Sequence, residues 1–320
     1  MSNAYRVIAS RPAKAKRCSS RRYSRFASTL LEFFALYRTA LASQVHRQLI
    51  DQLPTDRVTR LHLQTLVAAG ELEVIREPGI NSPNVYVVTR RGLRAMDSRH
   101  VFDTKPRTRS HVAHELLITE VAVSLKDVTR LRADIKLCWQ ERFALAQHTS
   151  FRELVPDYAF LFQHDVGRLL CLVEVSSGEE SATRLGQKLH KFADWAESPE
   201  GYEFIVELYR QCGAAKPRPQ FRLLVVAENR RSGNDATRVR QVFGEAMRLP
   251  RGLRRRLWAT TVHALADASG IDDPIWIRGQ DLEDAVAEWE TLPQAKRVRF
   301  LTAAIKNVPR HRLFPEAGEK

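Results

Sequence analysis

The chain has 320 residues, 44% of them hydrophobic, and a formal net charge of +14. This length allows about two domains, and the apolar content is too high for a disordered chain. A strongly basic balance favours a polyanionic partner, most often nucleic acid. Residues 1–110 hold 20 Lys or Arg and 8 Asp or Glu, so most of the positive charge belongs to the N-terminal third.

Several classes of protein are disfavoured by what the sequence lacks. No apolar run reaches the roughly 18–20 residues of a membrane span. The segment after Met1 has no apolar stretch typical of a secretion signal. The four cysteines lie far apart without metal-ligand spacing, and Cys138 and Cys171 fall in apolar runs that predict buried free thiols. We therefore expect a cytoplasmic, nucleoid-associated protein with no membrane contact.

The first 22 residues are basic and contain no acid. Pro12 and several serines interrupt any regular pattern, so we predict a flexible arm. Such an arm can contact phosphates or can be a solvated tail, and both interpretations stay open.

Residues 23–99 show three helical patterns followed by two short strands. Leu30, Phe34 and Tyr37 lie on the apolar stripe of the first helix. Thr55 can cap the third helix, and Gly70 can end it in a left-handed conformation. The expected elements are helices at 23–38, 41–49 and 55–69, strands at 72–76 and 85–89 around a turn-rich loop, and a closing helix from residue 89.

This order resembles the winged helix-turn-helix of bacterial DNA-binding proteins. In the third helix, Arg57, Arg60 and Gln64 share one face through their i, i+3, i+7 spacing. Arginine and glutamine can read base edges in the major groove of double-stranded DNA. Arg90 and Arg91, beyond the expected wing, are candidates for phosphate contacts. The alternative is a winged helix used for protein contact, with these arginines only solvated.

The remainder of the chain alternates strands with helices, which predicts an α/β domain with a mixed central sheet and an α+β chain overall. Strand patterns include 131–146, 221–227, 257–265 and 274–277, and a helix pattern covers 235–247. The expected organisation is a basic arm at 1–22, a winged helix at 23–99, a linker at 100–110, the α/β domain at 111–280, and C-terminal helices and tail at 281–320.

Two apolar runs near the middle of the chain each contain one acid, Asp157 in the first and Glu174 in the second. The polar residues 164–168 between them predict a turn, and a helix follows over 182–195. A buried carboxylate without a partner is strongly unfavourable. A divalent metal shared by the two acids would account for them, although Glu174 can instead pair with Lys188 as a structural ion pair.

The order helix–strand–strand–strand–helix–strand resembles the core of the PD-(D/E)xK nuclease fold, as in restriction endonucleases. Pro156-Asp157 matches the PD element, and Glu174 lies in the next strand. The resemblance implies Mg²⁺ held by Asp157 and Glu174, with Glu115 as the optional third, helix-borne acid. The motif's lysine position is Ser176, so the catalytic lysine would be Lys188, or else Lys191, from the following helix.

The whole architecture, over roughly residues 23–230, is similar to that of the replication-relaxation proteins of plasmids and mobile elements. That family combines a winged helix with a helix comparable to His111–Leu117, a PD strand, an LVEV-type strand and a lysine-bearing helix. Members often carry an acid two residues after the glutamate, where this chain has Ser176. The resemblance implies DNA binding in plasmid replication, relaxation or mobilisation.

These observations predict a DNA-binding accessory protein of plasmid or mobile-element replication or mobilisation, whose nuclease-like domain acts as a scaffold. One alternative is a Mg²⁺-dependent DNA endonuclease using Asp157, Glu174 and Lys188. A second alternative is a transcription regulator whose second domain senses a ligand. The expected partners are double-stranded DNA and a relaxase, replication or transposition protein, with a homodimer as a further option.

Overall fold

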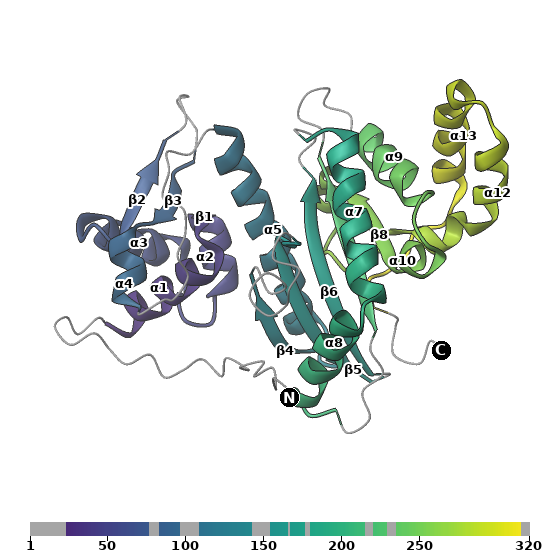
Figure 1. Ribbon diagram of the computed structural model, residues 1–320. Helices are drawn as coiled ribbons and strands as arrows, with labels where there is room; N and C mark the ends of the chain where they lie inside the picture. Colours follow the sequence, from purple (N-terminus) through teal and green to yellow (C-terminus); the bar gives the residue numbers. More distant parts are fainter. Residues whose placement is uncertain are drawn as a thin grey trace. The chain divides into compact units, whose positions relative to one another are not determined.

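The computed structural model forms two compact units, whose described residues lie within 24–127 and 128–314 (Figure 1). The first contains a three-stranded antiparallel sheet and the second a six-stranded mixed sheet. This content confirms the expected α+β class. The described residues are 24–76, 83–96, 109–142, 154–165, 167–176, 180–214, 220–228 and 235–314.

Three predicted features lie wholly or partly outside the described residues. The basic arm at 1–22 lies outside the described residues, as do most of the linker at 100–110 and residues 77–82 of the expected wing loop. None of the helices in the described ranges is both long enough and apolar enough to cross a membrane.

The elements of the N-terminal unit follow the expected order, with one added strand, at residues 39–41, that pairs with the central strand of the sheet. The added strand is only three residues long, and its pairing comes from tertiary contacts that no local pattern reveals. The elements are α1 (Arg25–Tyr37), β1 (Thr39–Leu41), α2 (Ala42–Gln48), α3 (Asp56–Ala68), β2 (Leu72–Ile75), β3 (Val85–Val88), α4 (Arg90–Ala95) and α5 (Arg109–Leu131).

Local chemistry sets the ends of α3 and α4. Thr55 caps α3, its hydroxyl oxygen accepting a hydrogen bond from Val58 N at 3.2 Å. Gly70 follows α3 with φ of +73°, the left-handed conformation that glycine adopts without strain. Thr89 caps α4 and also donates to the Gly70 carbonyl at 2.8 Å. These contacts confirm the predicted helix ends.

Helix α5 is tied to the N-terminal unit by polar contacts. Thr119 Oγ1 donates to the Thr39 carbonyl at 2.7 Å. Arg47 pairs with Glu120 at 2.8 Å and with Asp127 at 2.9 Å. The helix extends well beyond His111–Leu117, the segment compared with a helix of the replication-relaxation proteins, and the boundary between the two units falls inside it, after Asp127.

The sheet of the C-terminal unit has the order β4-β5-β6-β7-β8-β9. Strands β4, β5 and β6 form an antiparallel meander, β7 and β8 run parallel to β6, and β9 is antiparallel to β8. The strands are β4 (Lys136–Glu141), β5 (Tyr158–His164), β6 (Gly167–Ser176), β7 (Phe221–Ala227), β8 (Leu257–Thr261) and β9 (Ile277–Arg278).

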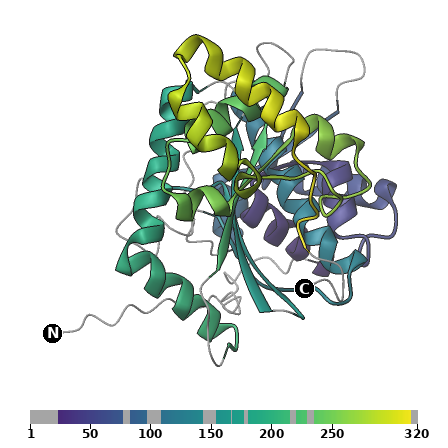
Figure 2. The same ribbon diagram turned by 90° about the vertical axis from the view of Figure 1, so that its right-hand side faces the viewer.

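One face of this sheet is covered by helices, which bury a single large apolar core against it (Figures 1 and 2). Strands β6 and β7 are buried along most of their length, as expected for central parallel strands. The helices of the unit are α7 (Ala182–Glu197), α8 (Pro199–Gln211), α9 (Asp235–Ala246), α10 (Arg251–Arg256), α11 (Val262–Asp267), α12 (Glu283–Thr291) and α13 (Gln294–Asn307), with a short 3₁₀ turn at Gly279–Leu282.

Two helices in this region correct the sequence prediction. The strand expected over 257–265 ends at Thr261, whose side chain accepts a hydrogen bond from Ala264 N and starts α11. Helix α8, absent from the prediction, begins with Pro199 after the capping residue Ser198. Its Gly201 lies so close to the Trp195 carbonyl that a Cβ atom would collide with it.

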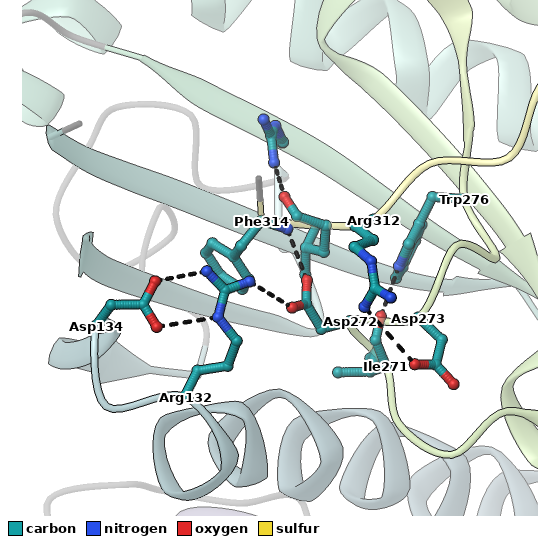
Figure 3. A network of polar contacts seen from close by, with 10 residues as sticks. Arg132, Asp134, Ile271, Asp272, Asp273, Trp276, Arg312 and Phe314 are labelled. Atoms are coloured by element: carbon teal, nitrogen blue, oxygen red, sulfur yellow. Dashed lines mark hydrogen bonds and ion pairs between the residues drawn. The ribbon is translucent and has the colours of Figure 1, made fainter. Parts of the chain in front are cut away.

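The last described residues are held by a polar network (Figure 3). Arg132 binds Asp134 at 2.5 Å and Asp272 at 3.0 Å. Asp272 in turn accepts a hydrogen bond from the backbone N–H of Phe314 at 2.7 Å. The Arg132 hydrogen bond lowers the pKa of Asp134, whereas burial raises the pKa of Asp272. Phe314 then packs edge-on against Phe162 of β5.

We predict that Arg132→Ala lowers the free energy of unfolding of the C-terminal unit by about 1–2 kcal/mol, because partly exposed pairs contribute less than buried ones. Arg312→Ala is the matched control: its pair with Asp273 is 4.0 Å long and more exposed, so the change should stay within about 0.5 kcal/mol. All five tryptophans lie in residues 128–320, so urea unfolding followed by tryptophan fluorescence reports this unit alone. Equal effects of the two substitutions would contradict the prediction.

Candidate functional site

The β5–β6 hairpin brings the two predicted acids together. Tyr158 pairs with Val173, so the same antiparallel register places Asp157 opposite Glu174. Residues of the two strands alternate between faces, and both acids lie on the face that packs against α7. Glu174 therefore lies in β6, as the sequence predicted, Asp157 lies directly before β5, and the hairpin makes the two acids neighbours.

Glu174 is 4% exposed and lies inside the apolar sheet. Its Oε1 accepts a hydrogen bond from Lys188 Nζ at 2.5 Å, which is also an ion pair. Lys188 is positioned by α7, which Ser181 caps and which buries Leu185 and Phe192 against the sheet. Of the two lysines that the sequence offered, the structure pairs Lys188 with Glu174, whereas Lys191 is exposed.

Asp157 has a backbone role as well as its place beside Glu174. Its N–H donates to the Val173 carbonyl at 2.9 Å, and its Oδ2 accepts from Val175 N at 2.7 Å. The carboxylate thus extends the hairpin ladder by one side-chain hydrogen bond. This contact fixes the position of the carboxylate next to Glu174. It is compatible both with a structural role of Asp157 and with a catalytic one.

Burial and ion pairing have opposite effects on the pKa values of Glu174 and Lys188. Burial raises the pKa of Glu174 above its ordinary value, the Lys188 ammonium opposes that rise, and the Asp157 carboxylate adds to it. Burial alone would lower the pKa of Lys188, but the charges of Glu174, Asp157 and Glu180 raise it above its ordinary value. Lys188 is therefore held as a cation by three acids.

A second cation, which no sequence pattern predicted, lies at the carboxyl end of β6. Arg238 of α9 is 1% exposed and donates from Nε to Ser176 Oγ at 2.7 Å. It also pairs with Glu180 at 3.0 Å and bonds Gln241 at 2.9 Å. Ser176 is the residue that the resemblance to the nuclease motif aligns with its lysine, so a guanidinium supplied by another helix lies next to that residue. The one sequence signal for this contact is that Arg238 lies on a stripe of α9 that is otherwise apolar.

The donor set at the acids is compatible with Mg²⁺. Glu174 Oε2 is buried and has no hydrogen-bond partner among the described residues, so one carboxylate oxygen is open to a ligand. Mg²⁺ typically binds one or two carboxylates and keeps several waters, so Asp157 and Glu174 suffice in number. Within the described ranges, no group of three or more His, Cys, Asp or Glu has metal-site geometry.

Glu115, the predicted third metal ligand, lies in the N-terminal unit on α5. It is buried and faces Arg38 at 3.8 Å and His111 at 3.9 Å. These two groups partner its charge within its own unit. Its participation in a metal site stays a prediction.

The predicted DNA-reading residues lie on one exposed face of α3. Arg57, Arg60 and Gln64 are all exposed, and Thr59, Leu63 and Leu66 bury the opposite face. Arg60 pairs with Asp56 at 2.7 Å, an exposed contact of the kind that contributes at most about 1 kcal/mol and is readily exchanged. Arg90 and Arg91, in the first turn of α4, are also exposed. Leu61, 61% exposed on the same helix, was not singled out from the sequence.

Comparison with known proteins adds one match. The family model described as replication-relaxation matches residues 31–205, which run from the middle of α1 to the middle of α8 and include Asp157, Glu174 and Lys188. No curated protein and no solved structure matches the chain.

We predict that Lys188→Met destabilises the C-terminal unit by about 3 kcal/mol, because Glu174 would be left buried without its partner. The double variant Lys188→Met/Glu174→Gln should recover most of that loss, since neither charge then remains. Urea unfolding with tryptophan fluorescence measures both. Lys191→Met, the control on the exposed side of α7, should change stability by no more than about 0.5 kcal/mol. A double variant that is at least as unstable as Lys188→Met alone would show that the two charges are not coupled.

Proposed function

Because this chain belongs to the replication-relaxation family, we propose that it is a DNA-binding accessory protein of plasmid or mobile-element replication or mobilisation. In this proposal the N-terminal unit docks on double-stranded DNA as a winged helix. The C-terminal unit retains a nuclease-like core and serves as a scaffold for a relaxase, replication or transposition protein.

The exposed face of α3 is the single observation that carries the DNA-binding part. Its three polar side chains project from a helix whose opposite face is buried, as a helix inserted in the major groove requires. Arg90 and Arg91 add positive charge after β3, where phosphates would lie beside the wing. The charge excess of residues 1–110 supports the same interpretation.

The charge balance of the acidic cluster supports the scaffold part. Lys188 compensates Glu174, and Arg238 compensates Glu180, so the unit can fold without a metal. The position where the nuclease motif has its lysine is Ser176, whose hydroxyl is bonded to Arg238. These contacts stabilise the core and do not by themselves require catalysis.

We predict that replacing Arg57, Arg60 and Gln64 with alanine raises the Kd for a plasmid-derived duplex at least about tenfold, since each base contact contributes about 1–3 kcal/mol. The loss of two cations should also reduce the salt dependence of log Kd by up to about 2 units of slope. Fluorescence anisotropy at several salt concentrations measures both quantities.

The control removes the same number of charges elsewhere. Arg299→Ala/Lys306→Ala changes two exposed cations on α13 and should leave the Kd and its salt slope nearly unchanged. If the two variants weaken binding equally, general charge and not the α3 face accounts for the affinity.

A second function, a Mg²⁺-dependent DNA endonuclease, is favoured by the open Oε2 of Glu174. Asp157 and Glu174 would hold the ion, which when bound supplies charge stabilisation at the phosphate and a more acidic water. The hairpin hydrogen bond from Val175 N would orient the Asp157 carboxylate. Lys188 would hold the Glu174 carboxylate in place and supply positive charge beside it.

The scaffold role predicts no nicking of supercoiled plasmid by the wild-type protein with Mg²⁺ or Mn²⁺, measured by agarose gel electrophoresis. Asp157→Asn is included because it keeps the side-chain volume and removes the charge. Nicking that disappears in Asp157→Asn and Lys188→Met but persists in Lys191→Met would establish the endonuclease instead. Nicking that survives all three substitutions would identify a contaminating nuclease.

A further inference from the structure

Two cysteines that are 74 positions apart in the sequence meet at one edge of the C-terminal unit. Cys138 belongs to β4, and Cys212 is the residue that ends α8. Both pack against the same apolar core, and each thiol shifts the pKa of the other. Both are free and half-buried, so solvent reaches them, contrary to the prediction that Cys138 is fully buried.

A bulge in the sheet explains how Cys138 reaches α8. Leu137 pairs with Phe162 and Trp139 with Leu161, so Cys138 is an extra residue without a partner on β5. Such a bulge redirects side chains that would otherwise alternate between faces. Cys138 and Trp139 consequently both pack against the helix-covered core, where Cys212 also packs.

The surroundings of the pair are polar and positively charged. Gln163 Oε1 lies 3.9 Å from Cys138 Sγ and accepts a hydrogen bond from Arg168 Nη2 at 3.2 Å. The same arginine nitrogen donates to the Cys212 carbonyl at 2.7 Å. Lys136 adds a second cation to the charge felt by Cys138. Among the described residues, Lys136, Arg168 and Cys212 all lower the pKa of Cys138.

These neighbours make the two thiols unequal. The hydrogen bond from Cys212, with help from the Arg168 charge, lowers the pKa of Cys138 to about 7, and the same bond raises the pKa of Cys212. Burial raises the pKa of Cys171 to about 12, so that thiol stays protonated and inert. A thiolate beside a thiol that can attack its oxidised form is the arrangement found in redox-sensing cysteines.

We propose that Cys138 and Cys212 form a modification site for hydroperoxides, at which a reversible disulfide is made. The Cys138 thiolate attacks the peroxide O–O bond, gives a sulfenic acid and releases hydroxide or alkoxide, so sulfur is oxidised and the peroxide is reduced. The Cys212 thiol then loses its proton to solvent, and the resulting thiolate attacks the Cys138 sulfur and forms the S–S bond. The sulfenic oxygen leaves as hydroxide, which takes up a proton and becomes water. A thiol reductant reverses the reaction.

The bond would enclose the whole acidic cluster. The loop from Cys138 to Cys212 contains β5, β6 and α7, and hence Asp157, Glu174 and Lys188. A cross-link over so long a loop restricts the unfolded chain and should raise the Tm of the C-terminal unit. This inference is independent of DNA binding and of metal binding.

The test treats the full chain, in a Cys18→Ser background, with hydrogen peroxide and maps its peptides without reduction. A peptide pair joined through Cys138 and Cys212 is expected, together with an unmodified Cys171 peptide as the internal control. In Cys212→Ser, a cyclic diketone probe should label Cys138 as sulfenic acid, because no second thiol resolves it. In Cys138→Ser, neither product should form.

Reactivity gives a second readout that does not depend on disulfide geometry. In Cys212→Ala the thiolate loses its hydrogen-bond donor, so alkylation of Cys138 by iodoacetamide at pH 7 should slow about fivefold relative to the parent chain. The alkylation rate of the parent should rise through about pH 7. Cys138 reacting as slowly as Cys171, or peroxide yielding only cross-links between chains, would overturn the proposal.

Discussion

The C-terminal unit depends on placing a carboxylate inside an apolar sheet. Glu174 points from a buried strand toward α7, where burial penalises its charge. Lys188 offsets that penalty, and its position requires that α7 pack with one particular face on the sheet. The ion pair thus fixes how helix and hairpin fit together, because a rotation of α7 would bury two unpaired charges.

Much of the architecture follows from local sequence signals. The sequence predicts the hairpin of β5 and β6, the turn between them and the caps of α3 and α4, because each depends on residues within a few positions of one another. The strand at residues 257–265 was overextended, since a short apolar run does not distinguish a strand from the start of a helix. Helix α8 was missed because Pro199 and Gly201 resemble a turn; in the structure one starts the helix and the other permits its close approach to Trp195.

The candidate site was only partly readable for a different reason. Spacing along the chain predicted two acids and offered two lysines, but only tertiary packing selects Lys188. The Arg238 contact with Ser176 joins residues 62 positions apart on α9 and β6, and no periodicity connects them. The thiol pair has the same origin, since a one-residue bulge in β4 decides which way Cys138 points. Long-range polar contacts are therefore the part of this protein that sequence patterns leave undetermined.

The charges around β6 also bear on whether the C-terminal unit needs a bound ion in order to fold. Asp157, Glu174 and Glu180 face two cations, Lys188 and Arg238, so the cluster carries a single excess negative charge. That balance lets the sheet fold without a bound ion, which a scaffold needs. It also leaves room for one further positive group, and both a metal ion and a basic side chain of a partner protein would satisfy it. Among the described residues, Glu174 Oε2 has no hydrogen-bond partner, so this oxygen is the place in the cluster where such a group would bind.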